Sequence, residues 1–151
     1  MKPDLSPRYR ARLFAFVLGL ACAAPLLAAP LPLHGRWLPD EPEAGRAVLT
    51  IKNATLSWRG RDALAPACAQ DYVLNKERPG TVYTDGRGTK FVAGSPGSIP
   101  TYLMTLGAGT CGTPGEQVRV RFPLIYDINH IEFIEYAAGK PVSARRLHRK
   151  K

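Results

Sequence analysis

Side chains that could perform catalysis are few in this chain and poorly grouped. Asp127, His130 and a serine would supply the carboxylate, imidazole and hydroxyl of a hydrolytic triad. No Gly-x-Ser-x-Gly sequence accompanies them, and Asp127 and Asn129 are residue types that favour turns between strands. We therefore predict that Asp127 and Asn129 shape a turn, and that the protein is not an enzyme.

Acid pairs and metal ligands give no stronger signal. Glu132 and Glu135 are three residues apart, so on a strand they point to opposite faces and make a poor acid/base couple. His34, His130 and His148 are scattered, without the spacing of a His-x-His or His-Glu-x-x-His site. No glycine loop precedes a helix as a phosphate-binding loop does. The sequence predicts neither a metal site nor a cofactor.

The N-terminus predicts export. Arg8, Arg10 and Arg12 precede an apolar run over residues 13–20, and alanines follow. This is the pattern of a signal peptide, which we place at residues 1–28, with cleavage after Ala23 as the alternative. Acylation of Cys22, as in a lipoprotein, and an uncleaved anchor are less favoured readings. The Ala, Arg, Pro and Gly bias is typical of a GC-rich bacterial genome, so the predicted location is the periplasm or the medium.

Two cysteines remain after this processing, Cys68 and Cys111. An even count in an exported chain predicts a disulfide, because thiols tend to pair in an oxidising compartment. Closing so long a loop stabilises a domain by about 4 kcal/mol in the chain-entropy model. A redox or metal pair is the competing reading, but it lacks a Cys-x-x-Cys spacing and a nearby histidine.

The charge excess gathers at the C-terminus. The chain has 21 basic and 12 acidic residues and a net charge of +9, and Lys2, Arg8, Arg10, Arg12 and Asp4 leave with the leader. Most of the remaining excess lies in residues 145–151, which we predict to be a solvated basic tail. Such a tail could meet nucleic acid, anionic lipid or an acidic partner. No aromatic residues interleave with its charges, so we expect no specific nucleic-acid partner.

The elements that position these residues are predicted to be strands. Val118, Val120 and Phe122 alternate with polar residues, which indicates a strand with one buried and one wet face. Further strands are predicted at residues 47–52, 55–59, 68–75, 81–84, 89–92, 101–106, 131–136 and 142–147, most of them joined by turn residues. No window beyond the leader has helical periodicity. We predict an all-β domain over residues 29–144, a single small antiparallel β-barrel or β-sandwich of about eight short strands with one disulfide.

Two short motifs resemble known families. Gly35-Arg36-Trp37 resembles the Gly-x-Trp of lipocalin-like small β-barrels. That resemblance implies that Trp37 closes one end of a barrel against an arginine of the last strand, for which Arg145 or Arg146 is suitably placed, and that a ligand cavity opens at the other end. The segment from Ser57 to Gly60 resembles an element of periplasmic lysozyme inhibitors, although a binder of a cationic enzyme should not be cationic.

These patterns together predict an exported, non-enzymatic binding protein. In the first version it holds a small hydrophobic ligand or envelope component, and Trp37, Trp58, Tyr102 and Phe133 line the cavity or form the core. In the alternative it is a protein-binding module, such as an inhibitor of an envelope enzyme, that uses the loops around Gly86 and Pro96. We expect no transmembrane segment in the mature chain.

Overall fold

The computed structural model describes residues 30–41, 43, 45–62, 64–94, 101–112, 115–124 and 127–151. The predicted signal peptide, with Cys22, and the predicted loop residue Pro96 lie outside these ranges. The described part of the chain is all-β and contains no helix. Its strands are β1 (Gly35–Pro39), β2 (Val48–Lys52), β3 (Thr55–Arg59), β4 (Cys68–Asn75), β5 (Val82–Thr84), β6 (Lys90–Val92), β7 (Thr101–Gly109), β8 (Gln117–Arg121), β9 (His130–Ala137) and β10 (Lys140–Arg149).

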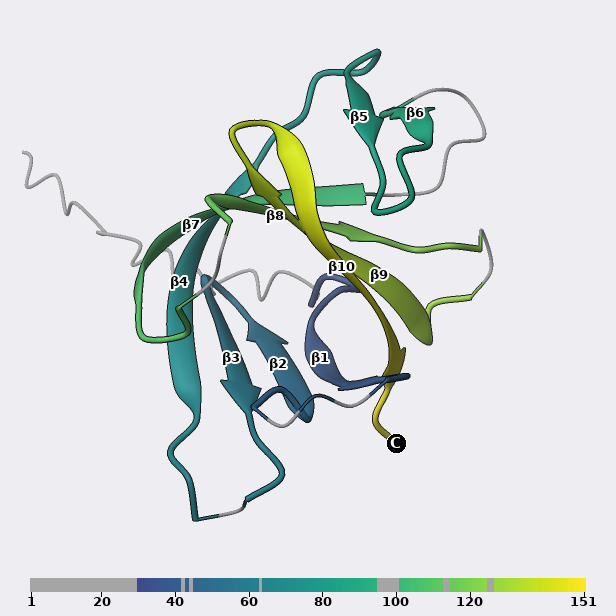
Figure 1. Ribbon diagram of the computed structural model, residues 1–151. Coiled ribbons are helices and arrows are strands. Elements are labelled where there is room, and N and C mark those ends of the chain that lie inside the picture. The colour runs from purple at the N-terminus through teal and green to yellow at the C-terminus, as the bar shows by residue number, and fades with distance from the viewer. Residues whose placement is uncertain are drawn as a thin grey trace, which may run out of the picture.

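Eight of these strands close into an antiparallel barrel (Figure 1). Each barrel strand pairs with the next one along the chain, and β10 returns to pair with β1. The exception is the step from β4 to β7, where β5 and β6 form a separate hairpin outside the barrel. The predicted all-β fold is confirmed, and it is a barrel and not a sandwich. Closure of the sheet removes the unpaired strand edges that a sandwich would leave.

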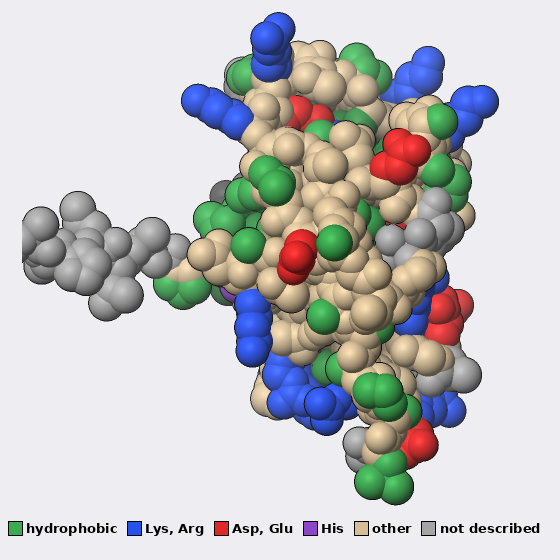
Figure 2. Space-filling view, turned by 90° about the vertical axis from the view of Figure 1, so that its left-hand side faces the viewer, with side chains coloured by type: hydrophobic (Ala, Val, Ile, Leu, Met, Phe, Trp, Pro, Cys, Tyr) green, Lys and Arg blue, Asp and Glu red, His purple; other side chains and the backbone are tan. Residues whose placement is uncertain are grey.

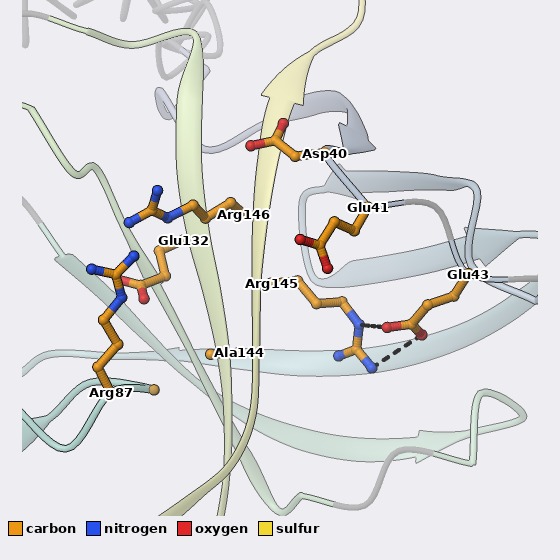
Figure 3. A pocket seen from close by; sticks show the side chains of 9 residues that line it. Asp40, Glu41, Glu43, Arg87, Glu132, Ala144, Arg145 and Arg146 are labelled. Atoms are coloured by element: carbon orange, nitrogen blue, oxygen red, sulfur yellow. Dashed lines mark hydrogen bonds and ion pairs between the residues drawn. The ribbon is translucent and has the colours of Figure 1, made fainter.

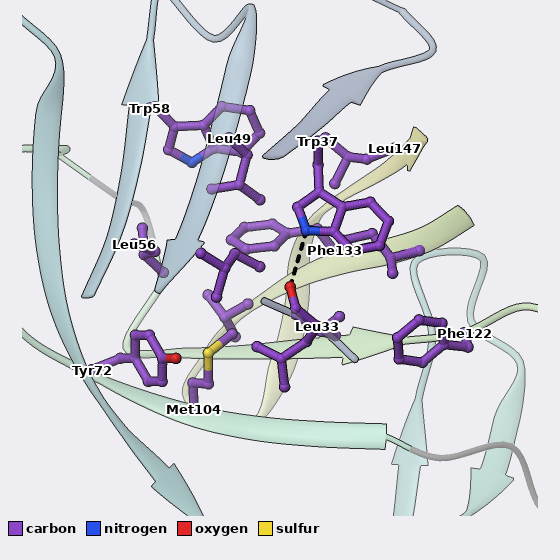
Figure 4. Close-up of a cluster of buried hydrophobic side chains, with 14 residues drawn as sticks. Leu33, Trp37, Leu49, Leu56, Trp58, Tyr72, Met104, Phe122, Phe133 and Leu147 are labelled. Atoms are coloured by element: carbon purple, nitrogen blue, oxygen red, sulfur yellow. Dashed lines mark hydrogen bonds between the residues drawn. The ribbon is translucent and has the colours of Figure 1, made fainter. Parts of the chain in front are cut away.

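Large apolar side chains fill the barrel (Figure 4). Trp37, Trp58 and Phe133 are each at most 1% exposed, and Trp58 meets Phe133 edge to face with 5.7 Å between ring centres. Each fully buried side chain of this kind stabilises the fold by roughly 1.5–3 kcal/mol. The other members of the core cluster are Leu33, Leu49, Ile51, Leu56, Tyr72, Met104, Val118, Val120, Phe122, Ile131 and Leu147.

One end of the barrel is closed around Trp37. Its indole Nε1 donates a hydrogen bond to the Leu33 carbonyl at 3.0 Å, and the Arg149 guanidinium lies 4.2 Å from the ring centre. Arg149 also donates to the carbonyls of His34 and Pro32, at 3.0 and 2.6 Å. The guanidinium therefore binds the indole face and ties the N-terminal lead-in to the last strand.

The prediction that Arg145 or Arg146 closes this end is wrong. Arg149 is the residue of β10 opposite Trp37 in the register, whereas Arg145 lies opposite Phe133 and Arg146 opposite Glu132 on the neighbouring strand. The predicted basic tail over residues 145–151 is wrong for the same reason. Because β10 continues to Arg149, only Lys150 and Lys151 follow the strand.

The position two residues before Trp37 requires a glycine, Gly35. Its φ is +144°, and a Cβ built there would lie 2.5 Å from Nη1 of Arg149. Arg149 cannot easily move aside, because carbonyls of the lead-in hold its guanidinium. Only a glycine lets the backbone pass beneath it.

The predicted turn and disulfide are both confirmed. The Asn129 amide donates to Oδ1 of Asp127 at 2.8 Å, and the ring of His130 bonds to the other carboxylate oxygen. The Asn129 amide and then His130 hold the pKa of the Asp127 carboxyl below its usual value. Cys68 of β4 is bonded to Cys111, with a Cα–Cα distance of 4.8 Å. Such a bond fits an oxidising compartment outside the cytoplasm.

Candidate functional site

The four aromatic residues predicted to line a cavity or form a core lie in or against the core. Trp37, Trp58 and Phe133 belong to the buried cluster, while Tyr102 is partly buried and packs against it. The Tyr102 ring meets Phe122 edge to face at 6.3 Å. They therefore pack against other side chains of the barrel interior. Trp58, although only 1% exposed, also borders an open hollow of about 360 Å³ between Arg46 and the Cys68–Cys111 disulfide.

The end of the barrel away from Trp37 holds a buried carboxylate. Glu135 of β9 is 0% exposed and shares the inward face with Phe133, two residues earlier. Its Oε2 lies 2.8 Å from Nη1 of Arg145 and 3.4 Å from Nη1 of Arg46. Arg145 also pairs with Glu43, with 2.9 Å between Nε and Oε1. A chain of four charged side chains thus occupies the barrel mouth.

This ionic cluster closes the mouth from two sides. Arg46 lies over the Trp58 ring, 5.7 Å from its centre, and comes from the segment before β2. Arg145 comes from β10 and, like Arg46, is mostly buried. Sequence reasoning missed the cluster, although the two-residue spacing of Phe133 and Glu135 already put the acid on the apolar face of the strand.

The β5–β6 hairpin covers the outer face of β8 and β9. Its Tyr83 ring lies 3.8 Å from the Arg119 guanidinium, and its Phe91 ring lies 4.2 Å from that of Arg121. The Tyr136 hydroxyl donates to the Thr84 carbonyl at 2.5 Å. Arg119 is only 3% exposed as a result, so the predicted wet face of this strand is wrong.

Ion pairs hold this hairpin and its flanking segment in place. Both Nη atoms of Arg119 bond to the carboxylate of Glu77, each at 2.5 Å, and Nη1 also donates to Thr101. The Arg121 guanidinium binds the carboxylate of Glu132 and lies 3.5 Å from Asp85 of the hairpin. Burial with paired charges makes these contacts costly to break one partner at a time.

A polar groove of about 450 Å³ runs between the hairpin turn, the segment after β1, and strands β9 and β10 (Figure 3). Some of its charges neutralise each other or their neighbours. Glu43 pairs with Arg145, and Asp40 bonds to His148 at 2.8 Å. Its lining residues are Asp40, Glu41, Glu43, Gly86, Arg87, Glu132, Ala144, Arg145 and Arg146.

Three charges of the polar groove are left for an incoming molecule. Within the described residues, no ion pair involves Glu41, Arg87 or Arg146. In Figure 3 the guanidinium groups of Arg87 and Arg146 extend toward the side of Glu132, while Glu41 comes from the opposite wall. The groove therefore offers a carboxylate on one side and two guanidinium groups on the other.

Neither a metal site nor a membrane helix is found in the described ranges. No group of three or more His, Cys, Asp or Glu side chains there is placed to hold a metal ion. No helix in the same part of the chain is long and apolar enough to cross a membrane.

A comparison of the chain with protein-family models, with curated proteins and with solved structures found no match. Function is therefore inferred from the chain's own geometry.

Proposed function

We propose that this is an exported, non-enzymatic binding protein of the bacterial envelope that binds another protein through the polar groove. The observation that carries the proposal is the occupied barrel interior. Packed aromatic and aliphatic side chains fill it, and the buried Glu135 with its two arginines stands at the mouth. A small hydrophobic ligand needs a largely apolar cavity of about 300 Å³ or more, whereas the described side chains fill the barrel interior. A protein partner is therefore favoured over a small ligand.

The character of the polar groove supports a protein partner. Among the described residues, its lining contains charged side chains and only one apolar residue, Ala144. Charges arranged in this way match complementary charges on a protein surface and determine orientation and association rate. The turn that contains Gly86, one of the loops predicted to bind, forms part of its wall.

The proposal also includes export from the cytoplasm and a relationship to lipocalin-like barrels. The predicted signal peptide and the Cys68–Cys111 bond support export. The stacking of Arg149 on Trp37 in a closed eight-stranded barrel supports the resemblance to lipocalin-like barrels.

Titration with fatty acids and a hydrophobic dye tests the occupied interior. We expect no saturable change in the fluorescence of Trp37 and Trp58, because both indoles are already packed against protein atoms. Saturable quenching of the tryptophan fluorescence by micromolar dye, reversed when a fatty acid displaces the dye, would favour the small-ligand function instead.

Affinity capture from an envelope extract tests the protein partner. The baits are the wild-type mature protein, the charge reversal Arg87→Glu/Arg146→Glu, and the control Arg78→Glu/Lys90→Glu, which changes the same charge outside the groove. We expect a protein retained at about 0.05 M salt by the wild type and the control, but not by the groove variant, and released at about 0.5 M salt. Equal retention by all three baits would contradict a groove interface.

A further inference from the structure

We infer that the outer face of β1, β2 and β3 is a second binding site, which takes an anionic polysaccharide. This face has a hollow of about 490 Å³, and none of the described residues that line it is acidic. We call it the basic face and define it by three cations and three hydroxyl side chains: Arg36, Lys52, Arg59, Thr50, Thr55 and Ser57.

Strand register brings these residues together. Arg36 of β1 lies opposite Thr50 of β2, which lies opposite Ser57 of β3. Lys52 and Thr55 form the next pair of the same face. The hollow is therefore lined by short hydroxyl side chains, which we call its floor, and by longer cationic side chains, which we call its rim.

The charges and hydroxyls of the basic face have no partners among the described residues. Within the described residues, Arg36, Lys52 and Arg59 take part in no ion pair. The three hydroxyls form no hydrogen bond with other described side chains or backbone groups. The neighbouring acid is Asp71 of β4, opposite Thr55, and it lies outside the lining of the hollow. Donors are thus available for an anion and for neutral hydroxyl groups at once.

This combination fits an anionic polysaccharide better than other polyanions. A sugar chain presents carboxylate or sulfate groups to guanidinium and ammonium groups, and hydroxyls to Thr and Ser. Nucleic acid would need aromatic side chains on which bases stack, and the described lining of the hollow contains none. A lipid surface would need apolar anchors, whereas the apolar lining is only one valine and two alanines.

The basic face is separate from the polar groove. The two hollows share no lining residue, so this inference does not rest on the proposed protein partner. Figure 2 shows Lys and Arg side chains both around the top of the molecule and over its lower part, where the acids lie toward one side. The excess charge is therefore arranged on a folded surface, and a chain terminus does not account for it.

Calorimetric titration at low salt tests the inference with polymers of defined chemistry. The probes are dextran sulfate and polygalacturonate, which distinguish sulfate from carboxylate groups, with neutral dextran as the uncharged control. We expect at least one anionic glycan to bind, with affinity that falls as salt rises, and neutral dextran not to bind. Poly(dT) and poly-glutamate are the other arms. Equal affinity for either of them would overturn the choice of a glycan, and no binding to both anionic glycans would overturn the site.

Variants locate the binding on the molecule. Arg36→Gln/Lys52→Gln/Arg59→Gln should weaken glycan binding about tenfold or more. The control Arg78→Gln/Lys90→Gln/Lys140→Gln removes the same charge from other surfaces and should change binding much less. Equal losses in the two triple variants would mean that net charge alone attracts the glycan, and the site would be wrong. Circular dichroism confirms that each variant is folded.

A charge-neutral variant tests the hydroxyl floor. Thr50→Val/Ser57→Ala leaves every cation in place, so simple attraction between charges predicts no change. We expect a several-fold loss of glycan affinity, because the hydroxyls donate to or accept from the sugar. Unchanged affinity would overturn the role of the floor and leave only the charges.

Discussion

Individual residues of this barrel adopt conformations that their types do not favour. Ala54, in the turn between β2 and β3, has a φ of +60°, and Ala138, in the turn between β9 and β10, has a φ of +49°. Two-residue hairpin turns need left-handed backbone, which costs a residue with a Cβ about 1–2 kcal/mol. The tight pairing of the flanking strands imposes this conformation on both alanines.

Ala54→Gly should stabilise the protein. Glycine adopts the same φ without the steric cost. The gain in unfolding free energy should be about 1 kcal/mol once the larger conformational entropy that glycine gives the unfolded chain is subtracted. Chemical denaturation measures it, with Ala69→Gly, inside β4, as the control that should destabilise. A less stable Ala54→Gly protein would show that the turn is not strained.

The buried carboxylate in the mouth should matter far more than an exposed one. Glu135→Leu leaves two mostly buried guanidinium groups without their shared partner, and should lower the unfolding free energy by about 3 kcal/mol. Glu41→Leu, on an exposed loop, should change it by less than about 0.5 kcal/mol. Denaturant titration of both variants measures the difference. Similar values for the two would mean that water already screens the mouth cluster.

At the scale of the element, the β5–β6 hairpin is stable only through its contacts. Its strands have three residues each, and an isolated two-stranded hairpin is marginal in water. Tyr83 and Phe91 stack on each other, at 5.7 Å, and on the two arginines of β8. The hairpin therefore acts as a cover whose stability depends on buried ion pairs.

Removal of one such pair should loosen the hairpin alone. Glu77→Gln breaks the two-pronged contact with Arg119, so the amides of residues 82–92 should exchange with deuterium at least about tenfold faster, while those of β2 and β3 keep their rates. Native-state hydrogen exchange followed by mass spectrometry measures this, with Asp62→Asn as the exposed control. Faster exchange throughout the barrel would show that the hairpin is part of one cooperative unit.

For the whole molecule, buried phenols predict loss of stability at alkaline pH. Burial, chiefly, raises the pKa of Tyr136 to about 12, from 10.0, and it also raises the pKa values of Tyr72, Tyr83 and Tyr102. A raised folded-state pKa gives stability that is complete below the unfolded pKa and is lost as pH rises through the folded pKa.

The unfolding free energy should therefore fall as pH rises from about 10 to about 12. Near-ultraviolet titration of the phenolates, beside denaturation at each pH, measures it. Tyr136→Phe should be less stable near neutral pH, because it lacks the bond to Thr84, but it should show a shallower alkaline loss. Phenols that all titrate at their ordinary pKa in the folded protein would contradict this burial.

Local patterns in the sequence were enough to predict most strands, the turn at Asp127 and the disulfide. Alternation of apolar residues acts within one strand, and an even number of cysteines in an exported chain needs no geometry to suggest a bond. The pairing partner of Trp37 could not be read in this way. The register of β1 against β10 places Arg149 opposite Trp37 in place of Arg145, and β10 is long enough to reach that position.

The same limit applies to the sites. Arg119 has the spacing of an exposed residue, but a hairpin from another part of the chain buries it. The polar groove joins segments that are about a hundred residues apart, and the basic face needs three strands in one register. Strand formation is a local property of the chain, whereas burial, charge pairing and surface shape depend on which distant segments meet, and closure of the barrel determines that.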